Sequence, residues 1–141
     1  MSIPHDGFSD EDIVEILKLK RIAVVGMSRD PRKAAHLVPK YLLENGYEII
    51  PVNPYADEIL GLKVYKSLKE IPEDIDIVEV FRPSDEVLDI VREAVEKNVK
   101  VIWLQEGIYN REAVEYAKKH GIKIVWNRCM YVEHRRLKDK L

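Results

Sequence analysis

Residues 22–33 of the chain read IAVVGMSRDPRK, a short apolar run that is closed by a glycine. A continuous apolar run of this length predicts a strand that is buried on both faces of a parallel sheet. A strand that ends in a tight glycine turn and leads into a helix is also how dinucleotide-binding folds begin. The stretch therefore predicts an α/β fold and raises the question of which ligand its turn accepts.

The same alternation of strand and helix continues along the chain. Short runs rich in Val and Ile predict further strands at residues 47–52, 75–80, 99–104 and 122–126, and helical spacing predicts helices at 35–45, 84–97 and 110–120. We also expect a capped helix after Ser9 and, near residues 63–65, a short edge strand followed by a partial helical turn. Pro39 is expected in the first turn of its helix, where a missing N–H is tolerated. This alternation predicts a single doubly wound parallel sheet, Rossmann-like, with helices on both faces.

Length and composition bound the class of protein. A chain of 141 residues has the usual size of one domain, so we expect residues 1–141 to form one domain on which the N-terminal helix within residues 1–20 packs. The net charge of −2 gives no basic footprint for nucleic acid, and no apolar run approaches the roughly 20 residues that cross a membrane. A single cysteine excludes an internal disulfide framework, and we expect a cytoplasmic protein. The many Lys and Glu residues suggest a thermophile.

The turn after the first strand keeps one part of the dinucleotide fingerprint and lacks the rest. That fingerprint, G-x-G-x-x-G, needs three glycines, and in the frame GMSRDP only Gly26 is present, followed by Met27. NAD binding also needs an acidic residue at the end of the second strand, where this chain has Asn53 and Pro54. The sequence therefore argues against ordinary NAD binding, and it contains no P-loop motif.

A phosphate site is still compatible with this turn. Backbone N–H groups near the start of a helix, together with the Ser28 hydroxyl, can hold a phosphate, and Arg29, Arg32 or Lys33 can supply positive charge. The alternative for these bases is a solvated loop. In a doubly wound sheet, ligands bind outside the carboxyl ends of the strands. The loops expected there are all polar or carry Gly or Pro, at residues 26–28, 53–54, 81–84, 105–107 and 127–129.

Six segments carry a resemblance to a known family. They are VVGMS, YEIIPVNP, GLKVYKSL, VFRPSDEV, IWLQEGI and WNRCMYVEH, and they occur in the same order as in small stand-alone coenzyme A-binding proteins. The resemblance covers roughly residues 21–134. It extends to the CoA-binding domain of the succinyl-CoA synthetase alpha subunit and of related acyl-CoA synthetases that form ADP. It implies coenzyme A as the ligand, bound at the carboxyl edge of the sheet.

The resemblance also implies roles for particular residues. Gly26 and Ser28 would hold phosphate, basic residues near Lys33 or Lys40 would be the partners of the remaining phosphates, and Asn53 and Pro54 would line the nucleotide side. Met27 and Arg32 belong to the same turn, and we expect them among the binding residues as well. Arg82, Pro83 and Ser84 would pass along the coenzyme, and Gln105 and Gly107 would border the pantetheine. An independent argument supports CoA, because a neutral Asn53 removes the repulsion that an acidic residue would impose on the phosphates of CoA. The alternative for Ser84 is a helix N-cap.

No catalytic or metal-binding pattern accompanies these motifs. The four histidines and the scattered carboxylates form neither a Ser-His-Asp arrangement nor the spacing of metal ligands, although His36 lies close enough to the expected phosphate site to touch a ligand. The related ligases use a second domain with a phosphohistidine and an ATP-grasp partner, neither of which we expect in this chain. We therefore expect a non-catalytic CoA-binding protein. An enzyme or a detached enzyme subunit acting on an acyl-CoA or a nucleotide is the alternative, and a homodimer or another protein partner is left open.

Cys129 is the candidate redox residue. A lone cysteine is commonly an inert buried side chain. The neighbouring Arg128 would favour the thiolate if it turned toward the sulfur, and a thiolate facing the pocket would form a mixed disulfide with the CoA thiol.

Overall fold

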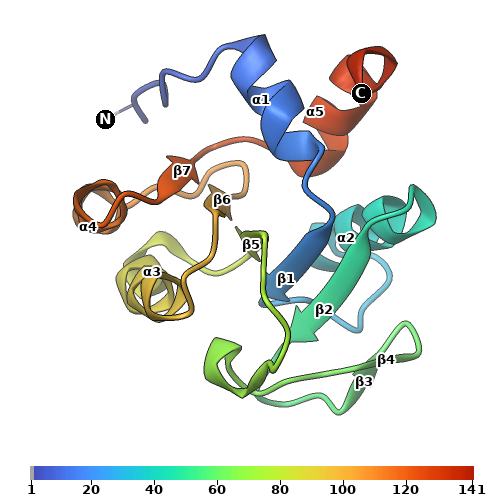
Figure 1. Cartoon of the computed structure of the whole chain (residues 1–141). Helices are drawn as coiled ribbons and strands as arrows, with labels where there is room; N and C mark the ends of the chain where they lie inside the picture. Colours follow the sequence, from blue (N-terminus) through green and yellow to red (C-terminus); the bar gives the residue numbers. More distant parts are fainter. Residues whose placement is uncertain (1) are drawn as a thin grey trace.

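A five-stranded parallel sheet forms the centre of the computed structural model, which describes residues 2–141 (Figure 1). The strand order is β2-β1-β5-β6-β7. The strands are β1 (Arg21–Val25), β2 (Glu48–Val52), β5 (Ile77–Val80), β6 (Val101–Leu104) and β7 (Lys123–Val125). The order reverses between β1 and β5, which is the switch point where doubly wound folds bind ligands.

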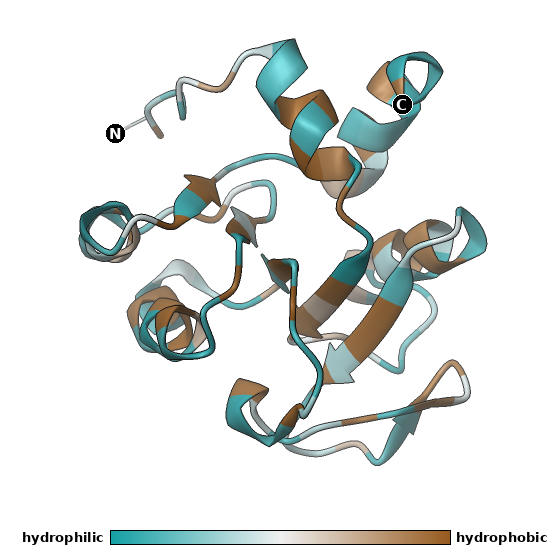
Figure 2. Ribbon diagram, viewed as in Figure 1, coloured by the Kyte–Doolittle hydropathy of each residue, from teal (hydrophilic) through white to brown (hydrophobic). Residues whose placement is uncertain are grey.

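Helices cover both faces of this sheet, which confirms the doubly wound α/β fold. One face carries α1 (Asp10–Leu17), α2 (Ala34–Glu44) and α5 (Met130–Leu137), and the other carries α3 (Val87–Glu96) and α4 (Arg111–Lys119). Two separate apolar cores lie between these helices and the sheet, one on each face. Figure 2 shows the apolar strands in brown and the helices divided between an apolar and a polar side.

The N-terminal helix begins as its sequence predicts. The Ser9 hydroxyl accepts the Asp12 N–H at 3.2 Å, and the Asp12 carboxylate accepts the Ser9 N–H at 3.0 Å, so the two residues form a capping box. The helix α1 packs beside α5 (Figure 1). Residues 2–9 run over the end of β7, where the Trp126 indole N–H donates to the Pro4 carbonyl at 2.7 Å. We call residues 2–9 the N-terminal arm.

Pro39 lies deeper in its helix than we expected. It is the sixth residue of α2, beyond the first turn, and the helix continues through it to Glu44. Because proline has no N–H, the Ala35 carbonyl one turn earlier loses its usual partner. That carbonyl instead accepts the Ser28 N–H at 3.1 Å. The proline therefore makes an acceptor in α2 available to the loop that follows β1.

Two further features differ from the sequence prediction. A small antiparallel hairpin of β3 (Glu58–Ile59) and β4 (Leu62–Lys63) replaces the expected edge strand, and Tyr65 makes only an isolated bridge to the sheet. The helix α5 is the second difference, because the sequence did not predict it. The short 3-10 helix η1 (Leu68–Glu70) matches the expected partial turn. The helix expected from residue 84 begins as the 3-10 helix η2 (Ser84–Glu86), and η3 (Lys138–Lys140) follows α5.

Glu79 is an acidic residue in the interior of the sheet. It lies in β5, paired in register between Val24 and Trp103 of the neighbouring strands, and its side chain is fully buried. Neither carboxylate oxygen has a hydrogen-bond partner among residues 2–141. Burial raises the pKa of Glu79 to about 8, so the side chain is largely a neutral acid at pH 7.

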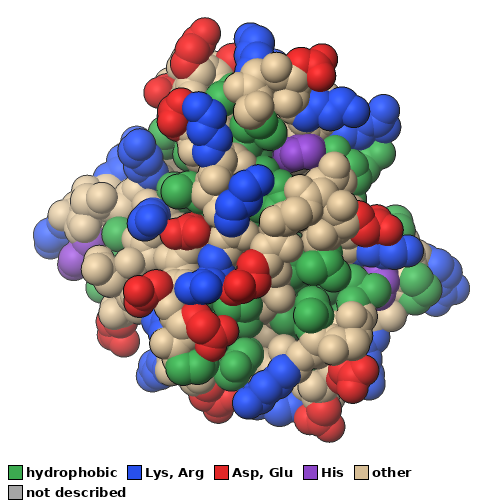
Figure 3. Space-filling model, turned by 45° about the vertical axis from the view of Figure 1, so that its right-hand side comes forward, with side chains coloured by type: hydrophobic (Ala, Val, Ile, Leu, Met, Phe, Trp, Pro, Cys, Tyr) green, Lys and Arg blue, Asp and Glu red, His purple; other side chains and the backbone are tan. Residues whose placement is uncertain are grey.

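The surface mixes both signs of charge. Figure 3 shows Lys and Arg interspersed with Asp and Glu over one face, with apolar patches between them. Within residues 2–141, no helix combines the length and the apolar character that crossing a membrane requires.

Candidate functional site

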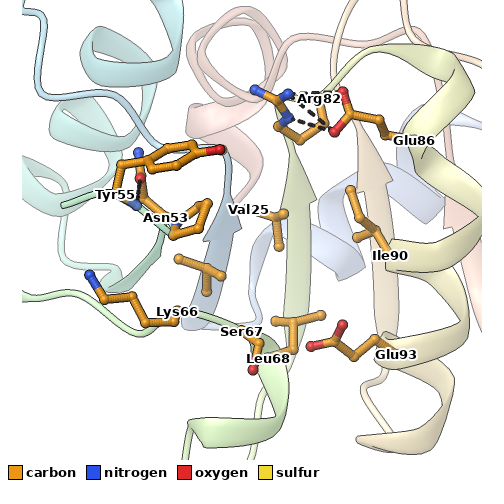
Figure 4. A pocket seen from close by; sticks show the side chains of 13 residues that line it. Val25, Asn53, Tyr55, Lys66, Ser67, Leu68, Arg82, Glu86, Ile90 and Glu93 are labelled. Carbon is orange, nitrogen blue, oxygen red and sulfur yellow. Dashed lines mark hydrogen bonds and ion pairs between the residues drawn. The ribbon is translucent and has the colours of Figure 1, made fainter.

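A cleft of about 280 Å³ opens at the carboxyl ends of β1 and β2, beside α3. We call it the α3 cleft (Figure 4). Its wall is partly apolar and partly charged. The residues that line it are Val25, Gly26, Val52, Asn53, Pro54, Tyr55, Lys66, Ser67, Leu68, Arg82, Glu86, Ile90 and Glu93.

A second hollow of about 590 Å³ lies around the loop that joins β1 to α2. We call it the loop hollow. It is lined by Gly26, Met27, Ser28, Arg29, Asp30, Lys33, Ala35, Asn53, Tyr55, Phe81 and Arg82. Gly26, Asn53, Tyr55 and Arg82 line both hollows, so the two join at the switch point of the sheet.

Gly26 lies at this junction in a conformation that favours glycine. Its φ is +87°, and a Cβ built there would lie 2.7 Å from the Arg82 Cδ and 2.9 Å from the Phe81 carbonyl oxygen. Because that carbonyl belongs to the backbone, it cannot turn aside for a side chain. The sequence predicted this glycine correctly as the tight turn after β1.

The loop after Gly26 is held mainly by its own hydrogen bonds. Ser28 uses three groups: its N–H donates to Ala35, its Oγ accepts the Asp30 N–H at 3.0 Å, and its carbonyl lies 2.7 Å from the His36 Nδ1. His36 therefore contacts the backbone of the loop, and its side chain lines neither hollow. The N–H groups of Met27 and Arg29 make no hydrogen bond to residues 2–141. Met27 is completely buried, so of the two only the Arg29 N–H is available to an anion.

The three bases of this loop have different surroundings. Arg29 and Lys33 line the loop hollow. Arg32 does not, because its guanidinium donates two hydrogen bonds of 3.0 Å to the Asp30 carboxylate. Its side chain is 88% exposed. Lys40, which the family resemblance also suggested, lies on α2 and lines neither hollow.

Asn53 ties the ends of β1 and β2 together. Its amide nitrogen donates to the Met27 carbonyl at 2.9 Å, and its amide oxygen accepts the N–H of Tyr55 at 2.7 Å and of Ala56 at 3.2 Å. An aspartate could accept the two N–H groups but could not donate to Met27. This geometry gives a structural reason for the neutral amide where NAD-binding folds carry an acid.

The charges of the two hollows differ. The loop hollow carries Arg29, Lys33 and Arg82 against the single acid Asp30. The α3 cleft carries two bases and two acids, which are Lys66, Arg82, Glu86 and Glu93. The loop hollow therefore suits phosphate groups, and the α3 cleft suits a group that is neutral overall and has an apolar face.

The remaining predicted residues lie along the rim but line neither hollow. Ser84 does not act as a side-chain N-cap, because its Oγ accepts the Tyr109 N–H at 3.2 Å. The Gln105 amide oxygen accepts the Met130 N–H at 3.3 Å, and the Gly107 N–H donates to the Asn127 side chain at 2.7 Å. Pro83 precedes η2 as its N-cap residue. These residues order the loops beside the site.

Cys129 also lies outside both hollows, as the residue before α5. The idea that Arg128 turns toward its sulfur is wrong. The Arg128 guanidinium instead donates to the Asp6 carboxylate at 2.8 Å and to the Glu133 carboxylate at 2.7 Å. The side chain of Arg128 is only 14% exposed, and it also donates to the Phe8 carbonyl at 3.0 Å. The mixed disulfide with CoA stays a prediction.

Several lining residues were missed by the sequence analysis. They are Tyr55, Lys66, Ser67, Leu68, Glu86, Ile90 and Glu93. Lys66, Ser67 and Leu68 belong to the segment GLKVYKSL and Glu86 to VFRPSDEV, two of the segments that carry the family resemblance, whereas Tyr55, Ile90 and Glu93 lie outside both. The course of the chain that brings the first segment across β2 could not be predicted from local patterns.

The chain is similar to known proteins in sequence and in fold. Residues 20–135 match the family model described as a CoA binding domain. The chain is 46% identical over 127 residues to the uncharacterized protein YneT of Bacillus subtilis, a match that covers 89% of this chain and 94% of that protein. A solved structure of a hypothetical protein from Pyrococcus horikoshii OT3 superposes with a TM-score of 0.93 at 47% identity, covering 98% of each chain.

A more distant match is to an enzyme subunit. The chain is 37% identical over 120 residues to the alpha subunit of the ADP-forming acetate–CoA ligase II of Pyrococcus furiosus. The match covers 77% of this chain but only 26% of that subunit, so the chain spans about a quarter of its length. The family match over residues 20–135 and the near full-length likeness to YneT lead to one conclusion: this chain belongs to the CoA-binding domain family.

Proposed function

We propose that this protein binds coenzyme A in the α3 cleft and the loop hollow together. The observation that carries the proposal is the junction of the two hollows at Gly26 and Arg82, with the excess of positive charge on the loop side. The phosphates of CoA would lie against the free N–H group of Arg29 and the side chain of Lys33, both in the lining of the loop hollow. The adenosine would lie in the α3 cleft, whose wall includes the apolar residues Leu68 and Ile90.

The predicted rim residues have an indirect role in this proposal. Pro83, Ser84, Gln105 and Gly107 would border the path of the pantetheine arm as it leaves the hollows. Asn53 and Pro54 would line the nucleotide side. The family membership supports the choice of CoA, and the neutral Asn53 supports it against NAD.

Ligand selectivity tests the proposal. CoA at a hundredfold excess over its dissociation constant should stabilise the fold by about 2.7 kcal/mol through mass action. NAD at the same concentration should give a much smaller shift of the melting temperature, because an acidic partner for its ribose is missing. Thermal unfolding with each ligand measures this difference. Equal shifts for NAD and CoA would contradict the proposal.

A binding role without catalysis is the simplest form of this function. The alternative is a detached subunit of an acyl-CoA ligase, which the likeness to the alpha subunit of an ADP-forming acetate–CoA ligase favours. Incubation with an acyl-CoA or with ATP, followed by detection of products, separates the two. Mass spectrometry of ligand retained after gentle purification would identify whether CoA, an acyl-CoA or a CoA disulfide is bound.

A further inference from the structure

Arg82, in the lining of the α3 cleft, is bound by a single carboxylate, that of Glu86. Its Nη2 lies 2.8 Å and 3.1 Å from the two oxygens of Glu86, and its Nε lies 3.3 Å from the Oε1. Figure 4 shows the two side chains facing each other from the end of β5 and the start of α3. Both are about half exposed, so solvent and a ligand can reach the pair.

The position of Arg82 makes this pair relevant to a ligand. Arg82 is the base common to the linings of both hollows, and its stem lies against Gly26. An anion that spans the junction must therefore meet this guanidinium. The same anion also meets the Glu86 carboxylate, which repels it.

We propose that Glu86 competes with the phosphate of the ligand for Arg82 and so sets how tightly an anion binds at the junction; this rests on the proposed function. A guanidinium presents planar forks of N–H donors that fit a carboxylate or a phosphate equally well. The carboxylate on Glu86 is tethered beside Arg82, so its effective concentration is high. A free monoanion gains little by replacing it, whereas a phosphate with two charges and three acceptor oxygens gains more. Glu86 thus lowers the affinity for every anion that binds through Arg82.

Calorimetric titration of CoA and of inorganic pyrophosphate into four variants tests this competition. Glu86→Gln should bind both probes about fivefold more tightly than the unmodified chain, since an exposed ion pair is worth up to roughly 1 kcal/mol. The matched control is Asp85→Asn, which removes the same charge from an adjacent exposed residue that lines neither hollow. Its affinity should stay within about twofold.

The remaining variants show whether the effect passes through Arg82. In the Arg82→Gln background, adding Glu86→Gln should change affinity by less than about twofold, because the contested donor is gone. Unchanged or weaker binding by Glu86→Gln overturns the inference, as does an equal gain from Asp85→Asn. If CoA fails to bind while pyrophosphate binds more tightly to Glu86→Gln, the proposed function fails and this inference stands. If neither probe binds any variant, both are wrong.

Discussion

Gly26 combines three constraints in one residue. Its backbone adopts a positive φ, a carbonyl oxygen faces the position of its missing Cβ, and the stem of Arg82 passes over it. The first constraint disfavours any other residue, and the other two exclude a side chain by contact. Gly46 after α2 has the first constraint alone, since its φ is +90° and nothing lies within 4 Å of its missing Cβ.

These two glycines allow a matched test. Gly46→Ala should lower the free energy of unfolding by about 1 kcal/mol, the cost of a positive φ with a Cβ. Gly26→Ala should lower it by roughly 3 kcal/mol, because displacement of packed atoms adds to that cost. Urea unfolding measures both. Equal losses would show that the contacts around Gly26 relax freely, and CoA binding should weaken only in Gly26→Ala.

At the scale of elements, α2 and the loop before it form one unit. The proline in the helix leaves the Ala35 carbonyl to the Ser28 N–H, and the His36 ring reaches back to the Ser28 carbonyl. The helix therefore positions the loop hollow through hydrogen bonds rather than by its N-terminus alone. A proline beyond the first turn destabilises the helix, but the carbonyl that it leaves unpaired orders the loop.

Replacing this proline tests the coupling. Pro39→Ala restores an N–H that competes with Ser28 for the Ala35 carbonyl, so the helix should gain stability while the loop loses order. Hydrogen exchange at the Ser28 amide should become about five- to tenfold faster, and CoA affinity should fall. Leu37→Ala, at a half-exposed position of the same helix, is the control. Slower or unchanged exchange at Ser28 in Pro39→Ala would show that the proline in α2 does not control the order of the loop.

The N-terminal arm is linked to the rest of the molecule by a largely buried arginine, Arg128. Arg128 pairs with Asp6 and Glu133, whose side chains are 1% and 9% exposed. Removing one member of such a group leaves the other charges buried without a partner, which typically costs 3–5 kcal/mol by mutational experience. Arg128→Ala should therefore destabilise the fold by about 3 kcal/mol and open residues 2–9 to proteases.

The matched control for the arm is an exposed pair. Arg111 pairs with Glu115 on α4, and both side chains are largely exposed. Arg111→Ala should change the unfolding free energy by less than about 0.5 kcal/mol. If Arg128→Ala were equally mild, or if the arm stayed resistant to limited proteolysis, the ion pairs would not be what holds it.

At the scale of the whole molecule, the sheet and most helices could be predicted because their patterns are local. Apolar runs for strands and spaced apolar residues for helices need no knowledge of the fold. The helix α5 could not, since two of its four buried residues are Glu133 and His134, which hide its apolar side. For the site, parallel strands bring Gly26, Asn53 and Arg82 to one edge by topology alone. Long-range partners, such as Asp6 for Arg128, leave no local signal.

Several aspartates define the acid limit of stability. The Ser9 N–H lowers the pKa of Asp12, and the Arg32 side chain lowers the pKa of Asp30, each by a hydrogen bond to the charged form. A carboxyl whose pKa is lower in the folded state stabilises the fold above its ordinary value of 3.8. That contribution is lost as the pH falls further.

Glu79 sets an opposite limit at high pH. Burial raises its pKa from the ordinary value of 4.5 to about 8, so the unfolded chain loses this proton near pH 4.5 while the folded chain keeps it. Folding is then favoured at low pH, and the contribution is lost as the pH rises to about 8, with a total change on the order of 5 kcal/mol. Together with the aspartates, this predicts greatest stability at about pH 4 to 5.

Glu79→Gln isolates this term, because an amide has the shape of the protonated acid and does not titrate. Between pH 5 and pH 9 the unmodified chain should lose several kcal/mol of unfolding free energy, and the variant should lose little. At pH 9 the variant should therefore be the more stable of the two. Urea unfolding across this range measures the difference, with Glu115→Gln at an exposed site of α4 as the control. Parallel pH profiles for Glu79→Gln and the unmodified chain would contradict this prediction. They would mean that the Glu79 carboxyl ionises in the folded protein without loss of stability, because water enters the sheet or the strands move.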